Sequence, residues 1–217
     1  MLKNSCININ AIILAAGNSS RFNGNKLLSI YNEKPLAMHI IEKSFEVGFK
    51  EIILVTQYNE LKEMLKDKDI KIIRNCMSNK GISYSIKLGL KECRNCDGVM
   101  FLVCDQPYIS YKTMKDLIEI FKENPDRIIS SKYCGKLRNP NIFPKKYFKE
   151  LLELNGDMGG KSIILNDLDN VLEYEIKNEL EVLDIDTKED LNKINTLIWG
   201  CIKINLIQSD KKKEENS

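Results

Sequence analysis

Short apolar runs alternate with segments of helical periodicity through the first 125 residues of the 217-residue chain. Each apolar run is nearly continuous, which is typical of a strand that is covered on both faces. A repeated strand-helix-strand order favours parallel pairing, because parallel neighbours need a crossover connection. We therefore predict an α/β fold in three layers, with a Rossmann-like, mostly parallel sheet and helices on both faces.

Periodicity and turn residues place the individual elements. We expect strands at residues 11–14, 51–56, 70–74, 98–104, 127–131, 171–176 and 182–185, and helices at residues 35–47, 58–66, 82–92, 110–122, 145–154, 160–166 and 188–199. After residue 130 the stretches GKLRNPNIFP and NGDMGG predict turns, with a small subdomain or an antiparallel excursion before the sheet resumes. We expect one domain over residues 1–200 and a charged, disordered tail over residues 201–217.

Composition and charge exclude several classes of partner. Thirty-three Lys and Arg against 31 Asp and Glu leave a net charge of +2, too little to indicate a nucleic acid or a membrane. The sequence has no apolar run of the length of a membrane span, and its N-terminus is too polar for a signal peptide, so we expect a cytoplasmic protein. Seven scattered cysteines read as free thiols, and the single CxxC at Cys93 and Cys96 lacks a second pair for zinc.

A loop of small residues, LAAGNSSRFNGNK at residues 14–26, follows the first expected strand. Gly17 permits a tight turn, the small residues after it let main-chain N–H groups face an anion, and Arg21 and Lys26 add positive charge. A Walker loop needs Gly, Lys and Ser or Thr in succession, and a dinucleotide-binding loop needs glycines where Ser19 and a phenylalanine stand. The pattern instead indicates another kind of cradle for the phosphates of a nucleotide.

Acidic residues follow two of the expected strands. Asp105, in the motif CDQP, can offer a carboxylate oxygen to a divalent metal held by phosphates, or can stabilise the turn after its strand. Asp184 and Asp186, in LDIDTKEDL, flank one apolar residue and so project the same way. Thr187 and Asp190 are spaced as a capping box, so helix capping explains part of this motif without a metal.

Three further positions are chemically informative. Gly81 precedes a helix with hydroxyl groups in its first turn, which suits a ribose or a base edge and also suits an ordinary helix start. The turn around Asp157 offers N–H groups and one carboxylate to an acceptor. His39 lies on the apolar face of an expected helix, and we interpret it as a packing histidine and not a catalyst.

Taken together, these motifs resemble the signature of nucleotidyltransferases of the molybdenum cofactor type, over roughly residues 9–195. The shared features are LAAGxSxR with a lysine five residues later, Asp-Gln-Pro, Gly-x-x-x-Ser, and a motif close to DIDTPEDL. The chain departs from the family pattern at Asn23, which replaces a glycine, at Asn139, which replaces a histidine, and at Gly160, which replaces an alanine.

The resemblance implies a fold of the nucleotide-diphospho-sugar transferase type and a single nucleotidyltransferase domain. The implied reaction moves CMP from CTP to the phosphate of molybdopterin, the molybdenum cofactor, with release of pyrophosphate and Mg²⁺ or Mn²⁺ as the metal. A molybdenum hydroxylase is the implied client. The implied catalytic residues are Lys26, Arg21 and Asp105, the metal ligands are Asp105 and Asp186, and the binding residues are Leu14, Ala15, Ala16, Gly17, Ser19, Arg21, Lys26, Gly81, Ser85 and Asp157.

The chain shows no Ser-His or Cys-His arrangement for a covalent intermediate, so we expect direct in-line transfer. Two alternatives stay open. One is a sugar-phosphate or alditol-phosphate nucleotidyltransferase, which shares the loop and the acids. The other is a protein that binds the nucleotide or cofactor and delivers it without turnover.

Overall fold

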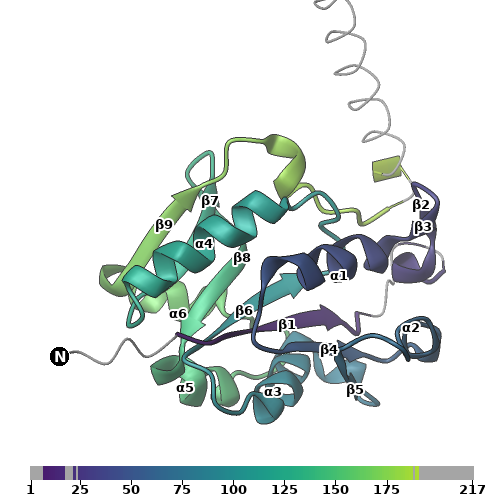
Figure 1. Cartoon of the computed structure of the whole chain (residues 1–217), viewed down its shortest axis with the longest axis horizontal. Helices are drawn as coiled ribbons and strands as arrows, with labels where there is room; N and C mark the ends of the chain where they lie inside the picture. The colour runs from purple at the N-terminus through teal and green to yellow at the C-terminus, as the bar shows by residue number, and fades with distance from the viewer. Residues whose placement is uncertain (1–6, 18–21, 23, 188, 191–217) are drawn as a thin grey trace, which may run out of the picture.

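The computed structural model describes residues 7–17, 22, 24–187 and 189–190. A seven-stranded sheet with the order β5-β4-β1-β6-β8-β7-β9 forms its centre (Figure 1). Its strands are β1 (Ile9–Ala15), β4 (Ile52–Thr56), β5 (Lys71–Arg74), β6 (Gly98–Val103), β7 (Ile128–Tyr133), β8 (Lys136–Pro144) and β9 (Val171–Glu175). A separate two-stranded sheet is made of β2 (Ile30–Tyr31) and β3 (Lys34–Pro35).

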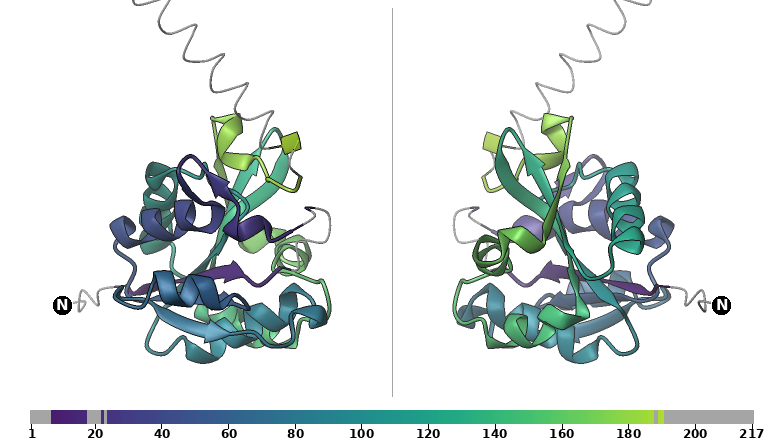
Figure 2. Two further views of the ribbon diagram at one scale, coloured as in Figure 1. Left: turned by 90° about the vertical axis from the view of Figure 1, so that its right-hand side faces the viewer. Right: turned by 90° about the vertical axis from the view of Figure 1, so that its left-hand side faces the viewer.

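Helices cover both faces of the main sheet, as the alternation predicts (Figures 1 and 2). They are α1 (Leu36–Val47), α2 (Asn59–Met64), α3 (Ile82–Glu92), α4 (Tyr111–Glu123), α5 (Phe148–Glu153) and α6 (Lys161–Asn166). Helices α1 and α4 contact each other on one face, and α3 contacts α5 on the other. The three-layer α/β prediction is confirmed.

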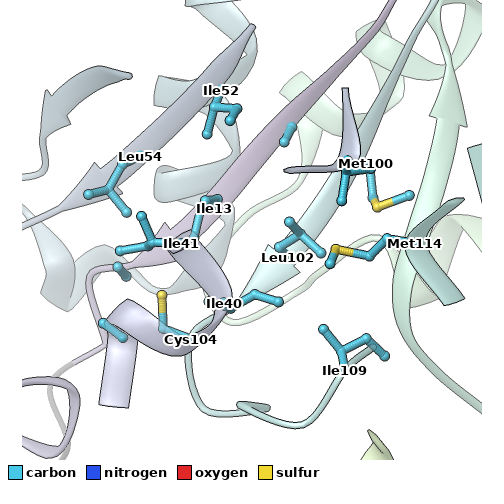
Figure 3. Close-up of a cluster of buried hydrophobic side chains, with 14 of the residues drawn as sticks. Ile13, Ile40, Ile41, Ile52, Leu54, Met100, Leu102, Cys104, Ile109 and Met114 are labelled. Carbon is cyan, nitrogen blue, oxygen red and sulfur yellow. The ribbon is translucent and has the colours of Figure 1, made fainter. Parts of the chain in front are cut away.

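Strand β1 is buried almost throughout because it lies between β4 and β6, parallel to both. Its alternate side chains belong to two different cores. Ile13 packs with Ile40 of α1 and Leu102 of β6 (Figure 3), whereas Ile12 joins the cluster on the opposite face with Ile86 of α3. A strand covered on both faces needs apolar residues at every position, which explains the continuous apolar run.

The turn predicted for GKLRNPNIFP is found only at its first residue, Gly135, and the antiparallel excursion is confirmed. This stretch forms β8, which pairs antiparallel with both β6 and β7 inside the main sheet. Its pairing register with β7 shifts between Ser130 and Ser131, opposite Pro140. Proline lacks an N–H and reads as a strand breaker, but an irregular ladder position accommodates it.

The strand expected at residues 182–185 is absent from the structure. A 3-10 helix, Glu179–Val182, leads into an extended segment that has no strand partner in the described sheet. This segment crosses the end of β6 instead, where the Ile185 N–H donates to the main-chain oxygen of Asp105 at 2.9 Å. Separate tertiary contacts, and not a ladder, therefore hold these residues.

Several expectations fall on residues that the structure does not describe, namely the helix at 188–199 apart from its helical residues 189–190, the tail at 201–217, and Ser19, Arg21 and Asn23 in the loop. The five described cysteines are free thiols, as predicted. None of the helices in the described part of the chain has the length and apolar character that crossing a bilayer requires.

Candidate active site

The loops that follow β1 and β6 meet beyond the carboxyl ends of these parallel strands, where ligands bind in open α/β sheets. The left-hand view of Figure 2 faces this edge. A cavity of about 280 Å³ opens here. Among the residues predicted for the site, Leu14, Ala16, Gly17, Lys26, Gly81, Ser85, Asp105 and Asp157 line it. Ala15 does not line it and is fully buried in β1.

Lys26 lies at the centre of the site and is 8% exposed. Its Nζ donates to Oδ2 of Asp105 at 3.1 Å and to Oδ1 of Asp186 at 2.9 Å. Burial on its own would lower the pKa of Lys26, but the charges and hydrogen bonds of the two carboxylates outweigh it and raise the pKa above 10.5. The ammonium is therefore charged at neutral pH, and it joins two acids that are far apart in the sequence.

A third carboxylate, Asp184, stands beside this pair and accepts a hydrogen bond from Nε2 of Gln106 at 2.8 Å. Displacement of water by nearby protein atoms raises the pKa of Asp184, and the negative charge of Asp105 adds to the shift. The capping-box prediction is also correct, because Oδ2 of Asp190 accepts from the Thr187 N–H at 2.8 Å. Asp190 thus caps the turn that begins at Thr187, while Asp186 accepts a hydrogen bond from Lys26.

The carboxylates suit a metal that is shared with phosphates. Within the described residues, His, Cys, Asp and Glu form no group of three that would enclose a metal by protein ligands alone. Mg²⁺ typically takes one or two protein carboxylates and completes its shell with phosphate oxygens and water. Asp105 and Asp186, which already converge on one cation, are an oxygen donor set of that kind.

The stem of the loop is braced from β4, a feature that the sequence analysis missed. Three successive residues at and just after the end of β4 each donate a side-chain hydrogen bond to a main-chain oxygen at the end of β1 or just after it. Thr56 Oγ1 donates to Ala15 O at 3.0 Å, Gln57 Nε2 donates to Ala16 O at 3.1 Å, and Tyr58 Oη donates to Gly17 O at 2.5 Å. The only sequence signal is that polar residues, TQY, end a strand adjacent to β1.

The opposite wall is formed by the start of α3 and by the turn that contains Asp157. Gly81 has φ +82°, and the Ser83 N–H donates to Gly156 O at 3.1 Å. Ser85 lines the cavity, but its Oγ accepts a hydrogen bond from Asn75 Nδ2 at 2.9 Å. The two segments, predicted separately to face a nucleotide and an acceptor, therefore lie side by side.

A second cavity of about 230 Å³ adjoins the first and shares Leu14, Ile82 and Val103 with it. Asn139, Asn141 and Gly160, from the stretch predicted to meet the acceptor, line this cavity. A Cβ built on Gly160 would lie 2.6 Å from the Phe143 ring. The packing of that ring explains why this position is glycine here.

The family comparison agrees with this architecture. The model of the MobA-like NTP transferase domain matches residues 11–171. Purine catabolism protein PucB of Bacillus subtilis is 23% identical over 195 residues, which are 84% of this chain and 94% of PucB. The 3-deoxy-manno-octulosonate cytidylyltransferase of Wigglesworthia glossinidia brevipalpis is 26% identical over 147 residues, 67% of this chain. The chain spans 60% of that enzyme and only 30% of the bifunctional protein GlmU of Buchnera aphidicola.

Solved structures share the fold. Rv0371c of Mycobacterium tuberculosis superposes with a TM-score of 0.74 at 21% identity, covering 87% of this chain and 97% of Rv0371c. A manganese complex of the same protein has the same TM-score over 86% of this chain and 97% of Rv0371c. The CMP:2-keto-3-deoxy-manno-octonic acid synthetase complexed with CTP has a TM-score of 0.72 at 14% identity, covering 89% of this chain and 99% of the synthetase chain. The nucleotide-diphospho-sugar transferase type of fold is therefore confirmed.

Proposed function

The chain belongs to the MobA-like NTP transferase domain family, and on that premise we propose that it is a nucleotidyltransferase that moves CMP from CTP to the phosphate of molybdopterin. The observation that carries this proposal is the buried Lys26, held between Asp105 and Asp186 at the base of the cavity that the chain leaving β1 borders. A fixed cation next to two acids is suited to stabilising charge on a transferred phosphoryl group.

In the proposed reaction, an oxygen of the acceptor phosphate attacks the α-phosphorus of CTP. The new bond joins that oxygen to the α-phosphorus, the bond from the α-phosphorus to the bridging oxygen breaks, and pyrophosphate leaves with the electron pair. Lys26 holds positive charge near the α-phosphate, and Arg21 with the loop N–H groups is assigned to the pyrophosphate. Because no group of the protein is covalently changed, its work is positioning and charge stabilisation.

Asp105 and Asp186 would hold the divalent metal, Mg²⁺ or Mn²⁺, which when bound supplies further positive charge to the phosphates. The carboxylate oxygens of the two residues support this assignment, as does the manganese complex of Rv0371c, a protein of the same fold. Lys26 then has a second task, since it keeps the two acids close together before any metal arrives.

The nucleotide and the acceptor are assigned to the two adjoining cavities. Ala16, Gly17, Gly81 and Ser85 line the first cavity and are assigned to the nucleotide, as is Ser19, whereas the turn around Asp157 is assigned to the acceptor. The methyl group of Ala16 disfavours a purine by its bulk. The amide of Asn139 in the second cavity, whose Oδ1 already accepts from Asn141 Nδ2 at 3.0 Å, can donate to the amide edge of a pterin. The domain is proposed to span residues 1–200, and the client to be a molybdenum hydroxylase.

A second candidate reaction is favoured by the names of two relatives. They are cytidylyltransferases for 3-deoxy-manno-octulosonate and for 2-C-methyl-D-erythritol 4-phosphate, the latter 29% identical over 119 residues, 52% of either chain. A sugar or alditol acceptor would use the same lysine and acids. Only the contents of the second cavity separate the two candidates.

Pyrophosphate release tests the proposal. Purified protein with Mg²⁺ and molybdenum cofactor should release pyrophosphate with CTP and not with GTP or ATP, and Asp105→Asn should abolish the release. Release with CTP and 2-C-methyl-D-erythritol 4-phosphate, but not with molybdenum cofactor, would establish the second candidate. Binding of CTP without release under either condition would indicate a carrier that does not turn over.

A further inference from the structure

Arg138 of β8 lines the second cavity with a guanidinium group that has no partner within the part of the chain described. Its Nε is buried and makes no hydrogen bond there. No described carboxylate lies within ion-pair distance of its terminal nitrogens, although Asp184 is near enough to feel its charge. The Nε–H of this cation in the cavity wall is thus left without an acceptor among the described residues.

Arg127 shows that this arrangement is specific to Arg138. Its Nε is also buried without a hydrogen bond among the described residues. However, Nη2 of Arg127 donates to the main-chain oxygens of Asp169 at 2.7 Å and Val171 at 3.5 Å. Arg127 therefore ties two segments of the chain together, whereas the Arg138 side chain makes no such contact with the residues that the structure describes.

The buried Nε–H of Arg138 has lost water and gained no acceptor among the described residues, which is costly for a polar group. Such a group is explained when a ligand supplies the missing acceptors. The planar fork of arginine matches the paired oxygens of a phosphate or a carboxylate, and hydrogen bonds of this kind are among the stronger ones in proteins. The unmet Nε–H donor of Arg138, on a guanidinium that lines the cavity, thus indicates an anionic ligand.

The position of Arg138 places this anion site next to the transfer centre. Strand β8 runs antiparallel to β6 with Asn141 opposite Phe101, so Arg138 lies toward the end of β6 from which Asp105 extends. Lys161 adds a second positive charge to the same cavity. Gln106 Nε2 donates to Oδ1 of Asp184, which lessens the repulsion between that carboxylate and an incoming anion.

The other residues that line the second cavity indicate the chemical character of the rest of the ligand. Leu137, Phe143 and Ile164 give the second cavity an apolar surface, and the Asn139 and Asn141 amides stand among them. We propose that Arg138 binds a phosphate or carboxylate of the acceptor, and that it thereby restricts the reaction to anionic acceptors with a flat or apolar body. That the bound anion belongs to the acceptor of the reaction rests on the proposed function, but the existence of the anion site does not.

Kinetics of matched arginine variants test the proposal. Arg138→Met should raise the KM for molybdenum cofactor at least tenfold and leave the KM for CTP within twofold, and Arg138→Lys should recover part of the loss. Arg127→Met, the control, should leave both KM values unchanged even where it lowers the melting temperature. An unchanged acceptor KM in Arg138→Met, or equal rises in both KM values, would overturn the proposal.

A binding measurement separates this proposal from the proposed function. The chain has five arginines, so their Nε–H signals in a ¹⁵N-labelled sample are few enough to assign. Titration with inorganic phosphate, in the absence of nucleotide, should shift the Arg138 signal to saturation and leave the Arg127 signal in place. A shift without pyrophosphate release in any assay would leave the anion site standing and remove the proposed function. An Arg138 signal that does not move would overturn the anion site, whatever the assays show.

Discussion

Gly81 and Asp157 meet so closely that a Cβ added to Gly81 would lie 2.6 Å from Oδ1 of Asp157. The same Cβ would lie 2.3 Å from the main-chain oxygen of Gly156. This contact joins the start of α3 to the turn that follows α5, and both segments line the first cavity. The wall between the proposed nucleotide and acceptor sites therefore depends on a missing side chain.

Gly81→Ala should weaken both stability and nucleotide binding. The added methyl must displace main-chain atoms, and alanine is strained at φ +82°, so we expect a loss of about 2–4 kcal/mol of unfolding free energy. Gly48 is the matched control, because it has φ +89° with nothing within 4 Å of its Cβ position. Urea unfolding should show a loss of only about 1 kcal/mol for Gly48→Ala. Equal losses in the two variants would mean that the contact with Asp157 is unimportant.

Lys26→Met should lower kcat by about 10²-fold or more, because it removes a fixed charge from the transfer centre. The variant should also unfold more readily, since Asp105 and Asp186 lose the cation that both contact. Adding Asp186→Asn to Lys26→Met should restore stability by removing one of the two repelling charges. Activity should stay low in the double variant. Recovery of activity together with stability would show that Lys26 acts only by holding the fold.

Gln57→Ala should raise the KM for the nucleotide severalfold and should also lower the melting temperature. The Gln57 amide donates to Ala16 O at 3.1 Å and Gly17 O at 3.3 Å, and its Oε1 accepts from Ser78 Oγ at 3.1 Å. Its loss should loosen both sides of the cavity at a cost of about 1 kcal/mol for each hydrogen bond. Asn124→Ala removes a comparable amide bond, to Ile120 O at 3.0 Å in α4, and should leave the KM unchanged. A nucleotide KM that is the same in Gln57→Ala and wild type would contradict the proposed brace.

His39 should make the protein less stable as the pH falls below about 6.5, the ordinary pKa of a histidine side chain. Burial lowers the pKa of His39 in the folded state, so the unfolded chain binds the proton more readily and acid favours unfolding. His39 is the single histidine of the chain, which makes the effect separable. Urea midpoints of wild type and His39→Gln, compared between pH 7.5 and pH 5, should diverge, with the wild type losing more at the lower pH. Parallel curves would assign the acid sensitivity to other groups.

Local pattern was enough to predict the central part of the fold. The continuous apolar runs of β1, β4 and β6, with helical periods between them, predicted a parallel sheet covered on both faces. A strand that is buried on both faces needs apolar side chains at successive positions, and this pattern is visible within each segment. The small residues after β1 and the acid after β6 likewise indicated where the cavity would open, since both directly follow their strands. The sequence alone also predicted the capping box of Thr187 and Asp190, which spans a few residues.

Relationships between distant segments were decided only by the tertiary structure. The stretch around Pro140 became a strand in the main sheet because β6 and β7 offer it partners and an irregular register, and residues 183–186 became a crossing segment because no strand lies beside them in the described sheet. The brace by Gln57, the contact at Gly81 and the Arg138 Nε–H without an acceptor in the described part of the chain have no local signature. A hydrogen bond forms only where the folded chain brings a donor within about 3 Å of an acceptor, and that distance cannot be read from the order of the residues.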